Sequence, residues 1–318
     1  SLLIVILWIV AAGALIYNRQ AITDWYRLRN YTPSPAVASL SQQDTLTDYG
    51  RKVFYVNKPE VLDKATFAEK CPDNGGEKTN ILGCYRGNQN GIYILSVSDP
   101  RLEGVVQVTS AHEMLHAGYD RLSSEEKEKV NALLMDFYNN QLTDERIKSI
   151  IEVYKKTEPN DVVNEMHSIF GTEVATLTPE LENYYKKYFL NRAAVTAYSS
   201  KYQAEFTTRQ AAVDAADARL KQLKAQIDQY EPELNDQSAL LTRRQRDLYA
   251  RRDAGNVDAY NAGVNSYNAA VSAFNAKIQA YKNAVDEYNS LLKQRNAIAF
   301  EENQLNDALS SKVDAINN

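Results

Sequence analysis

Histidine and cysteine are scarce in this chain, which has only three histidines and two cysteines among 318 residues. The cysteines form no Cys-x-x-Cys pair, so zinc-finger spacing is absent. Basic residues are not in excess, because 36 Lys and Arg stand against 41 Asp and Glu, for a net charge of -5. No basic patch or phosphate-binding loop occurs, and nucleic acid is therefore not an expected partner.

Charged residues are missing from the first 17 residues, which are almost wholly apolar. A run of this length is about the minimum that crosses a bilayer. Aromatic residues that follow it, Trp25 and Tyr26, are typical of a membrane interface. We expect a transmembrane anchor with a juxtamembrane segment over residues 1–30, and a cleaved signal peptide is the alternative.

The two cysteines, Cys71 and Cys84, flank a loop that contains Gly, Asn and Lys. A structural disulfide closing this loop is expected, with two unlinked buried thiols as the alternative. Disulfides persist outside the cytoplasm, whereas Arg19, Arg27 and Arg29 favour a cytoplasmic position for the flank of the anchor. We give the cysteines more weight and expect a single-pass protein of the cell membrane with an extracytoplasmic body.

The three histidines lie in two short motifs. His112, Glu113 and His116 form H-E-x-x-H within residues 102–122, where apolar residues recur at helical steps and proline is absent. On a helix, positions i and i+4 share a face, so two imidazoles can bind one Zn²⁺ while the glutamate reaches the water that the ion activates. The motif predicts metal-assisted hydrolysis; ordinary half-buried histidines beside a surface carboxylate are the alternative.

A catalytic zinc normally has three protein ligands. Tyr119 and Leu122 stand where the metzincin motif requires glycine and histidine, which excludes that subclass. The third ligand must therefore come from another part of the chain.

Residues 160–173 are the remaining source of a ligand. Asn160 or Asp161 is a good N-cap and Gly171 is a natural C-terminal stop, so the pattern predicts a three-turn helix. Glu165 lies in the middle of this helix, where a side chain holds its geometry best.

Glu173 and His167 are the alternatives to Glu165 as the third ligand. His167 is turned by about 200° from Glu165 around the helix, so the two are not expected to bind one metal together. His167 is instead a candidate catalytic residue that orients a ligand or steadies an oxyanion, or else a structural histidine.

With these motifs the chain resembles the gluzincins, the thermolysin-like zinc peptidases. These enzymes pair H-E-x-x-H with a glutamate from a later helix, often within an Asn-Glu dipeptide such as Asn164-Glu165. The resemblance implies that His112, His116 and Glu165 bind Zn²⁺ and that Glu113 is the general base. It also implies a peptide or protein substrate.

The rest of the chain has a simple organisation. Residues 31–39 are rich in proline and predict an extended linker, and residues 40–195 are long enough for one zincin-like catalytic domain. Apolar runs at 81–86 and 91–98, separated by a Gly- and Asn-rich turn, predict a short β-hairpin. The second run is either an edge strand that pairs with an extended peptide or an ordinary core strand.

Residues 196–318 predict a long antiparallel coiled-coil hairpin. Apolar residues follow heptads from residue 206, and the rhythm resumes after a turn at Gly255. Pro232 is expected to kink or interrupt the first arm. Such a hairpin serves as a spacer or as an arm that binds a protein partner.

Together these features predict a mainly α protein with an N-terminal transmembrane helix, a small α+β catalytic core and a C-terminal coiled-coil hairpin. The function we expect is that of a membrane-anchored zinc metallopeptidase. The alternative is a cell-envelope scaffold in which the coiled coil carries the function and the zinc site is structural or inactive.

Overall fold

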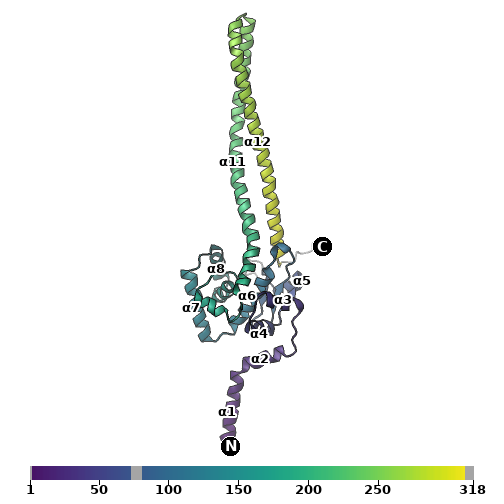
Figure 1. The fold of residues 1–318 in the computed structure, drawn as a ribbon, viewed down its shortest axis with the longest axis vertical. Helices are drawn as coiled ribbons and strands as arrows, with labels where there is room; N and C mark the ends of the chain where they lie inside the picture. The colour runs from purple at the N-terminus through teal and green to yellow at the C-terminus, as the bar shows by residue number, and fades with distance from the viewer. Residues whose placement is uncertain (1, 73–80, 312–318) are drawn as a thin grey trace. The chain divides into compact units, whose positions relative to one another are not determined.

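The computed structural model describes residues 2–72 and 81–311, so part of the loop between Cys71 and Cys84 lies outside the described residues (Figure 1). The chain divides into two compact units, which are described one at a time. The first unit comprises Ser1–Glu205 together with Leu305–Asn318, and the second comprises Phe206–Gln304.

The first unit is mainly helical and contains one small sheet. Its elements are α1 (Leu2–Tyr17), α2 (Arg19–Leu28), α3 (Pro35–Gln43), α4 (Asp48–Val56), β1 (Glu60–Leu62), α5 (Lys64–Lys70), β2 (Gly83–Tyr85), β3 (Ile92–Leu95), the 3-10 turn η1 (Pro100–Leu102), α6 (Val105–Asp120), α7 (Ser124–Asn140), α8 (Glu145–Thr157), α9 (Val162–Thr172) and α10 (Pro179–Tyr185). Two long helices, α11 (Arg192–Asp253) and α12 (Val257–Leu309), follow. The expectation of a mainly α fold with a short sheet is confirmed.

The apolar N-terminal run forms α1, but this helix has only 16 residues and Arg19 follows at the start of α2. Among the residues described, no helix has both the length and the apolarity that crossing a membrane requires. The predicted transmembrane helix is therefore wrong.

The segment after α1 is held by the first unit through side-chain contacts. Arg27 of α2 donates to the carbonyls of Val56 and Gln89, at 2.7 and 2.6 Å. In the next segment, α3 begins at Pro35 inside the predicted linker, because the Ser34 side chain accepts from a backbone N–H and caps the helix. Part of the predicted linker is thus regular helix.

The sheet has the order β1-β3-β2. β2 and β3 are antiparallel, as the predicted hairpin requires, and β1 adds a parallel strand on the other side of β3. The run that was a candidate edge strand therefore lies at the centre of the sheet. The edge strands are β1 and β2, and β2 is joined to the end of α5 by the disulfide between Cys71 and Cys84. The predicted disulfide is confirmed.

The core of the first unit centres on α6 and α9. Met114 and Leu115 of α6 and Phe170 of α9 are fully buried. Gly171 lies inside α9 and does not end it: a Cβ there would fall 2.3 Å from Leu115 Cδ1, so the residue is glycine because the two helices approach closely. The predicted helix stop is thus a packing position.

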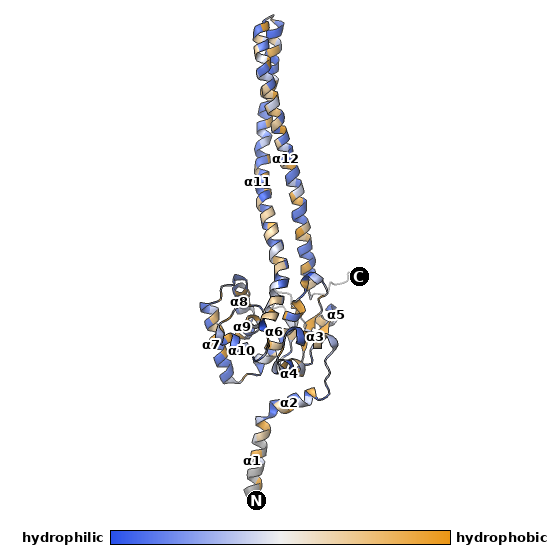
Figure 2. Ribbon diagram, viewed as in Figure 1, coloured by the Kyte–Doolittle hydropathy of each residue, from blue (hydrophilic) through white to orange (hydrophobic). Residues whose placement is uncertain are grey.

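The second unit is an antiparallel pair formed by α11 and α12, with the turn between Asp253 and Val257. Ion pairs link the two helices, among them Arg219 with Glu287 and Arg295 with Asp217. Hydrophobic and hydrophilic residues alternate along both helices, as a seam with solvated outer faces requires (Figure 2). α11 continues through Pro232, so the expected interruption does not occur.

Candidate metal centre

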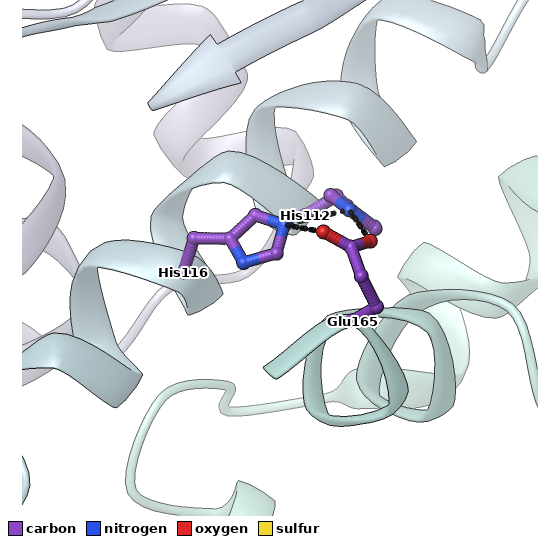
Figure 3. A group of neighbouring side chains, drawn as sticks. All are labelled: His112, His116 and Glu165. Carbon is purple, nitrogen blue, oxygen red and sulfur yellow. Dashed lines mark hydrogen bonds and ion pairs between the residues drawn. The ribbon is translucent and has the colours of Figure 1, made fainter. Parts of the chain in front are cut away.

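His112 and His116 stand one turn apart on α6 and point the same way (Figure 3). Their Nε2 atoms are 3.0 Å apart. The opposite side of α6 is packed into the core through Ala111, Met114 and Leu115, each fully buried, and this packing fixes the rotation of the helix. The two imidazoles consequently share one small volume, as the i and i+4 spacing predicts.

Glu165 on α9 completes the group. Its Oε1 lies 3.4 Å from His116 Nε2, and its Oε2 lies 3.6 Å from His112 Nε2 (Figure 3). Only 7% of Glu165 is exposed, which is an expensive place for a carboxylate unless charged or coordinating groups surround it. The close packing at Gly171 brings α9 near enough for this side chain to reach α6.

These three residues have the donor set and spacing that a zinc ion takes. Zinc bonds of about 2.0–2.1 Å at the tetrahedral angle put neighbouring donor atoms roughly 3.3 Å apart. The two histidine Nε2 atoms are 3.0 Å apart, and one Glu165 oxygen lies 3.4 Å from His116 Nε2 while the other lies 3.6 Å from His112 Nε2. Glu165 Oε2 is buried and accepts no hydrogen bond. A metal bond to this oxygen would remove the cost of leaving it unpaired. The residues fit Zn²⁺.

The charges in the group are coupled. Burial lowers the pKa of His112, but its contacts with the Glu165 carboxylate outweigh burial and raise the pKa to about 9. Burial likewise pushes the pKa of Glu165 upward, while His116, His112 and the Tyr154 hydroxyl outweigh it and leave the pKa below its ordinary value. A cation is thus favoured at the point where the three side chains meet.

Glu113 lies beside the group, under the edge strand β2. A Cβ on Gly83 would fall 2.8 Å from both Cγ and Oε1 of Glu113, so only glycine lets the strand pass this close. The backbone N–H of Tyr85 donates to the Glu113 carboxylate, yet burial dominates and raises the pKa of Glu113 above its ordinary value. A buried carboxylate with a raised pKa is suited to accept and return a proton.

A cleft of about 610 Å³ opens over these residues. β2 forms one wall of the cleft, and α8 contributes Arg146, Ile150 and Tyr154 to another. His112, Glu113, His116 and Glu165 all line it. The predicted ligands and the predicted base therefore face the same space, which is large enough for several residues of a peptide.

His167 does not line the cleft. It is fully buried, and its Nε2 lies 2.8 Å from the Tyr184 hydroxyl within a cluster of tyrosines. Burial lowers the pKa of His167 well below its ordinary value, so the imidazole is neutral. The helical phase that turns His167 away from Glu165 explains this position.

Glu173, the main rival ligand, lines the cleft but faces other partners. Its Oε2 accepts from Arg146 Nη1 at 2.8 Å and from Gln203 Nε2 at 3.0 Å. Because this oxygen is held by two donors, the structure does not bring Glu173 into the group formed by His112, His116 and Glu165.

Sequence reasoning did not single out the polar groups on the far side of Glu165. Tyr154 hydrogen-bonds to Glu165, and carboxylate oxygens of Glu158 and Asp161 lie within 4.8 Å of those of Glu165. The spacing of Arg146, Ile150 and Tyr154, each four residues from the next, was the available signal, because it places all three on one face of the predicted helix.

The chain matches no protein-family model, no curated protein and no solved structure.

Proposed function

We propose that the protein is a zinc-dependent hydrolase of peptide bonds. The observation that carries the proposal is the convergence of His112, His116 and Glu165 with Glu113 at their side in one cleft. A zinc ion held by these three residues would activate a water molecule and polarise a carbonyl group. Three protein ligands leave one coordination position open, which is typical of catalytic zinc sites.

The chain's own residues supply the proton transfers. Glu113 accepts a proton from the attacking water on its buried carboxylate and passes that proton to the nitrogen of the leaving amine. The position of Glu113 is fixed by the Tyr85 backbone N–H and by β2, which packs closely against Glu113 at Gly83. The edge position of β2 next to the cleft suits an extended peptide, which is why we favour a peptide over other hydrolysable substrates.

The disulfide between Cys71 and Cys84 supports a location in an oxidising compartment. Both cysteines line the cleft, so the shape of the candidate site depends on whether the disulfide is formed, and therefore on the compartment. Zinc content and hydrolysis are best measured on protein purified without reductant.

The proposal is tested by Glu113→Gln, assayed against a library of unstructured peptides with mass-spectrometric readout. We expect kcat/KM to fall by about 10²- to 10⁴-fold while the zinc content per chain is unchanged. Glu173→Gln is the matched control, since it removes a carboxylate of the same cleft that faces Arg146. A Glu113→Gln protein that cleaves as fast as the wild type would refute the mechanism.

The second candidate function is that of a scaffold that binds a protein partner through Phe206–Gln304. Its support is the set of ion pairs between α11 and α12, such as Lys277 with Glu233, which hold the hairpin together without any metal. Treatment with a zinc chelator separates the two functions. Partner binding through the hairpin survives chelation, whereas hydrolysis is lost and returns with added zinc.

A further inference from the structure

α8 and α9 form an antiparallel pair of helices joined by a short turn, and their facing side chains follow one register. Arg146 on α8 donates to Glu173 on α9 at 2.8 Å. Two turns further along α8, the Tyr154 hydroxyl hydrogen-bonds to Glu165, which lies two turns back along α9. The two contacts belong to one continuous helix interface, so each fixes the other.

In this register the carboxylates of Glu165 and Glu173 have different partners. Glu173 receives the guanidinium of Arg146 and the amide of Gln203, whereas Glu165, beside its contacts with the two histidines, receives the neutral Tyr154 hydroxyl and keeps Oε2 without a hydrogen-bond donor among the described residues. A guanidinium pairs strongly with a carboxylate and occupies it. A single hydroxyl orients a carboxylate while leaving its other lone pairs available to a metal.

We propose that Tyr154 is a positioning residue for the metal centre. Its hydroxyl holds the Glu165 carboxylate in the rotamer that faces His112 and His116, while Arg146 keeps Glu173 from competing as a ligand. The proposal rests on the proposed function, because it concerns the same zinc site. It adds the residue that determines which of two nearby carboxylates binds the ion.

The physical reason is the freedom of a glutamate side chain. The carboxyl group must settle within a fraction of an ångström to bind a metal tightly, and the hydrogen bond from Tyr154 removes part of its freedom. Hydrogen bonds from outside to a ligating side chain typically contribute about 10- to 100-fold to metal affinity. Tyr154 is partly buried in the wall of the cleft, which limits the motion of its side chain.

The test is the zinc affinity of Tyr154→Phe, measured by competition with a chromophoric chelator. We expect a loss of about 10- to 100-fold, with the melting temperature of the metal-free protein unchanged. Tyr202→Phe is the matched control, because Tyr202 lines the same cleft but bonds to Gln203 and to none of the three predicted ligands. Its affinity should equal that of the wild type.

A double-mutant cycle with Glu165→Ala shows whether Tyr154 acts through Glu165. In the Glu165→Ala background, Tyr154→Phe should cause no further loss of zinc affinity, since the group that it orients is gone. An equal loss in both backgrounds overturns the proposal. If Tyr154→Phe lowers the melting temperature of the metal-free protein, Tyr154→Gln, which restores an N–H donor without adding an imidazole, should recover affinity over Tyr154→Phe; no recovery also overturns it.

The outcomes separate this proposal from the proposed function. If the wild-type protein binds no zinc, both the proposed function and the role of Tyr154 are refuted. If the wild-type protein and the Tyr154→Phe variant bind zinc equally tightly, only the role of Tyr154 is refuted, and the proposed hydrolase function stands.

Discussion

The two units of the chain place their charged groups in opposite environments. In the first unit Glu113, His116 and Glu165 are each 7–8% exposed. In the hairpin, the side chains of the paired Arg219 and Glu287 are 44% and 49% exposed. Buried charges must be met by specific partners, whereas exposed pairs contribute at most about 1 kcal/mol each. The first unit should therefore be sensitive to polar substitutions and the hairpin to apolar ones.

The strongest test of this difference is Glu165→Ala. It removes one of the three proposed ligands from a buried site, so zinc affinity should fall by more than the roughly 100-fold that an outer contact contributes. The helicity of the hairpin, followed by circular dichroism, should not change. The exposed Asp236→Ala in α11 is the control and should leave zinc affinity at the wild-type value. Undiminished binding in Glu165→Ala would show that another residue completes the site.

Leu223→Ala makes the reverse test. Leu223 is 1% exposed at the seam of the hairpin, and truncation of a buried leucine costs about 2–4 kcal/mol. Urea unfolding should show this loss in the hairpin without any change in zinc affinity. Leu240→Ala is the matched control in the same helix, because Leu240 is 46% exposed and should lose less than about 1 kcal/mol. Equal losses for the two leucines would contradict the assignment of the seam.

Gly83→Ala tests how the polar site responds to a steric clash with an added methyl group. The new Cβ would lie 2.6 Å from Thr109 Cγ2 and 2.8 Å from the Glu113 carboxylate, so β2 or Glu113 must move. We expect a loss of about 1–3 kcal/mol in stability and a lower kcat/KM at constant zinc content. At Gly87 the nearest atom would be 3.9 Å away, so Gly87→Ala should change neither quantity. Full activity in Gly83→Ala would argue that Glu113 needs no fixed position.

Asp44→Asn should have the smallest effect, and the effect should depend on pH. Burial raises the pKa of Asp44 well above its ordinary value, although a hydrogen bond from the Ser110 hydroxyl opposes this. The folded chain thus holds the proton more tightly than the unfolded chain. The wild type therefore loses stability as pH rises from about 3.9 toward the folded pKa, by at most about 1.4 kcal/mol per pH unit.

Because asparagine does not titrate, the stability of Asp44→Asn relative to the wild type should increase with pH over that window. Urea unfolding at several pH values measures the difference. A constant difference for Asp44→Asn would mean that Asp44 is not buried as the structure places it.

Local patterns were sufficient to predict the helices that carry the candidate site. The i and i+4 spacing of His112 and His116 and the helical phase of Glu165 depend only on the 3.6-residue period, and the structure brings the three side chains together. The same period indicated that His167 points elsewhere. These features needed no knowledge of distant parts of the chain.

Features that depend on contacts between distant segments were missed. β1 pairs with β3 across an intervening helix, and no local signal marks that pairing. Gly171 was taken for a helix end because its contact with Leu115 is invisible in the sequence. The transmembrane prediction for the N-terminal run was wrong, because no helix among the described residues combines the length and the apolarity that crossing a membrane requires.

The proposed ligands come from α6 and α9, two helices that are separated in sequence by α7 and α8. An ion that needs all three donors binds only after these helices have docked, and it has no comparable site on the unfolded chain. If the proposed site takes zinc, each tenfold rise in free zinc above the dissociation constant would add about 1.4 kcal/mol to the stability of the folded form. A cell that withholds the metal would accumulate a looser, protease-sensitive form of the same polypeptide.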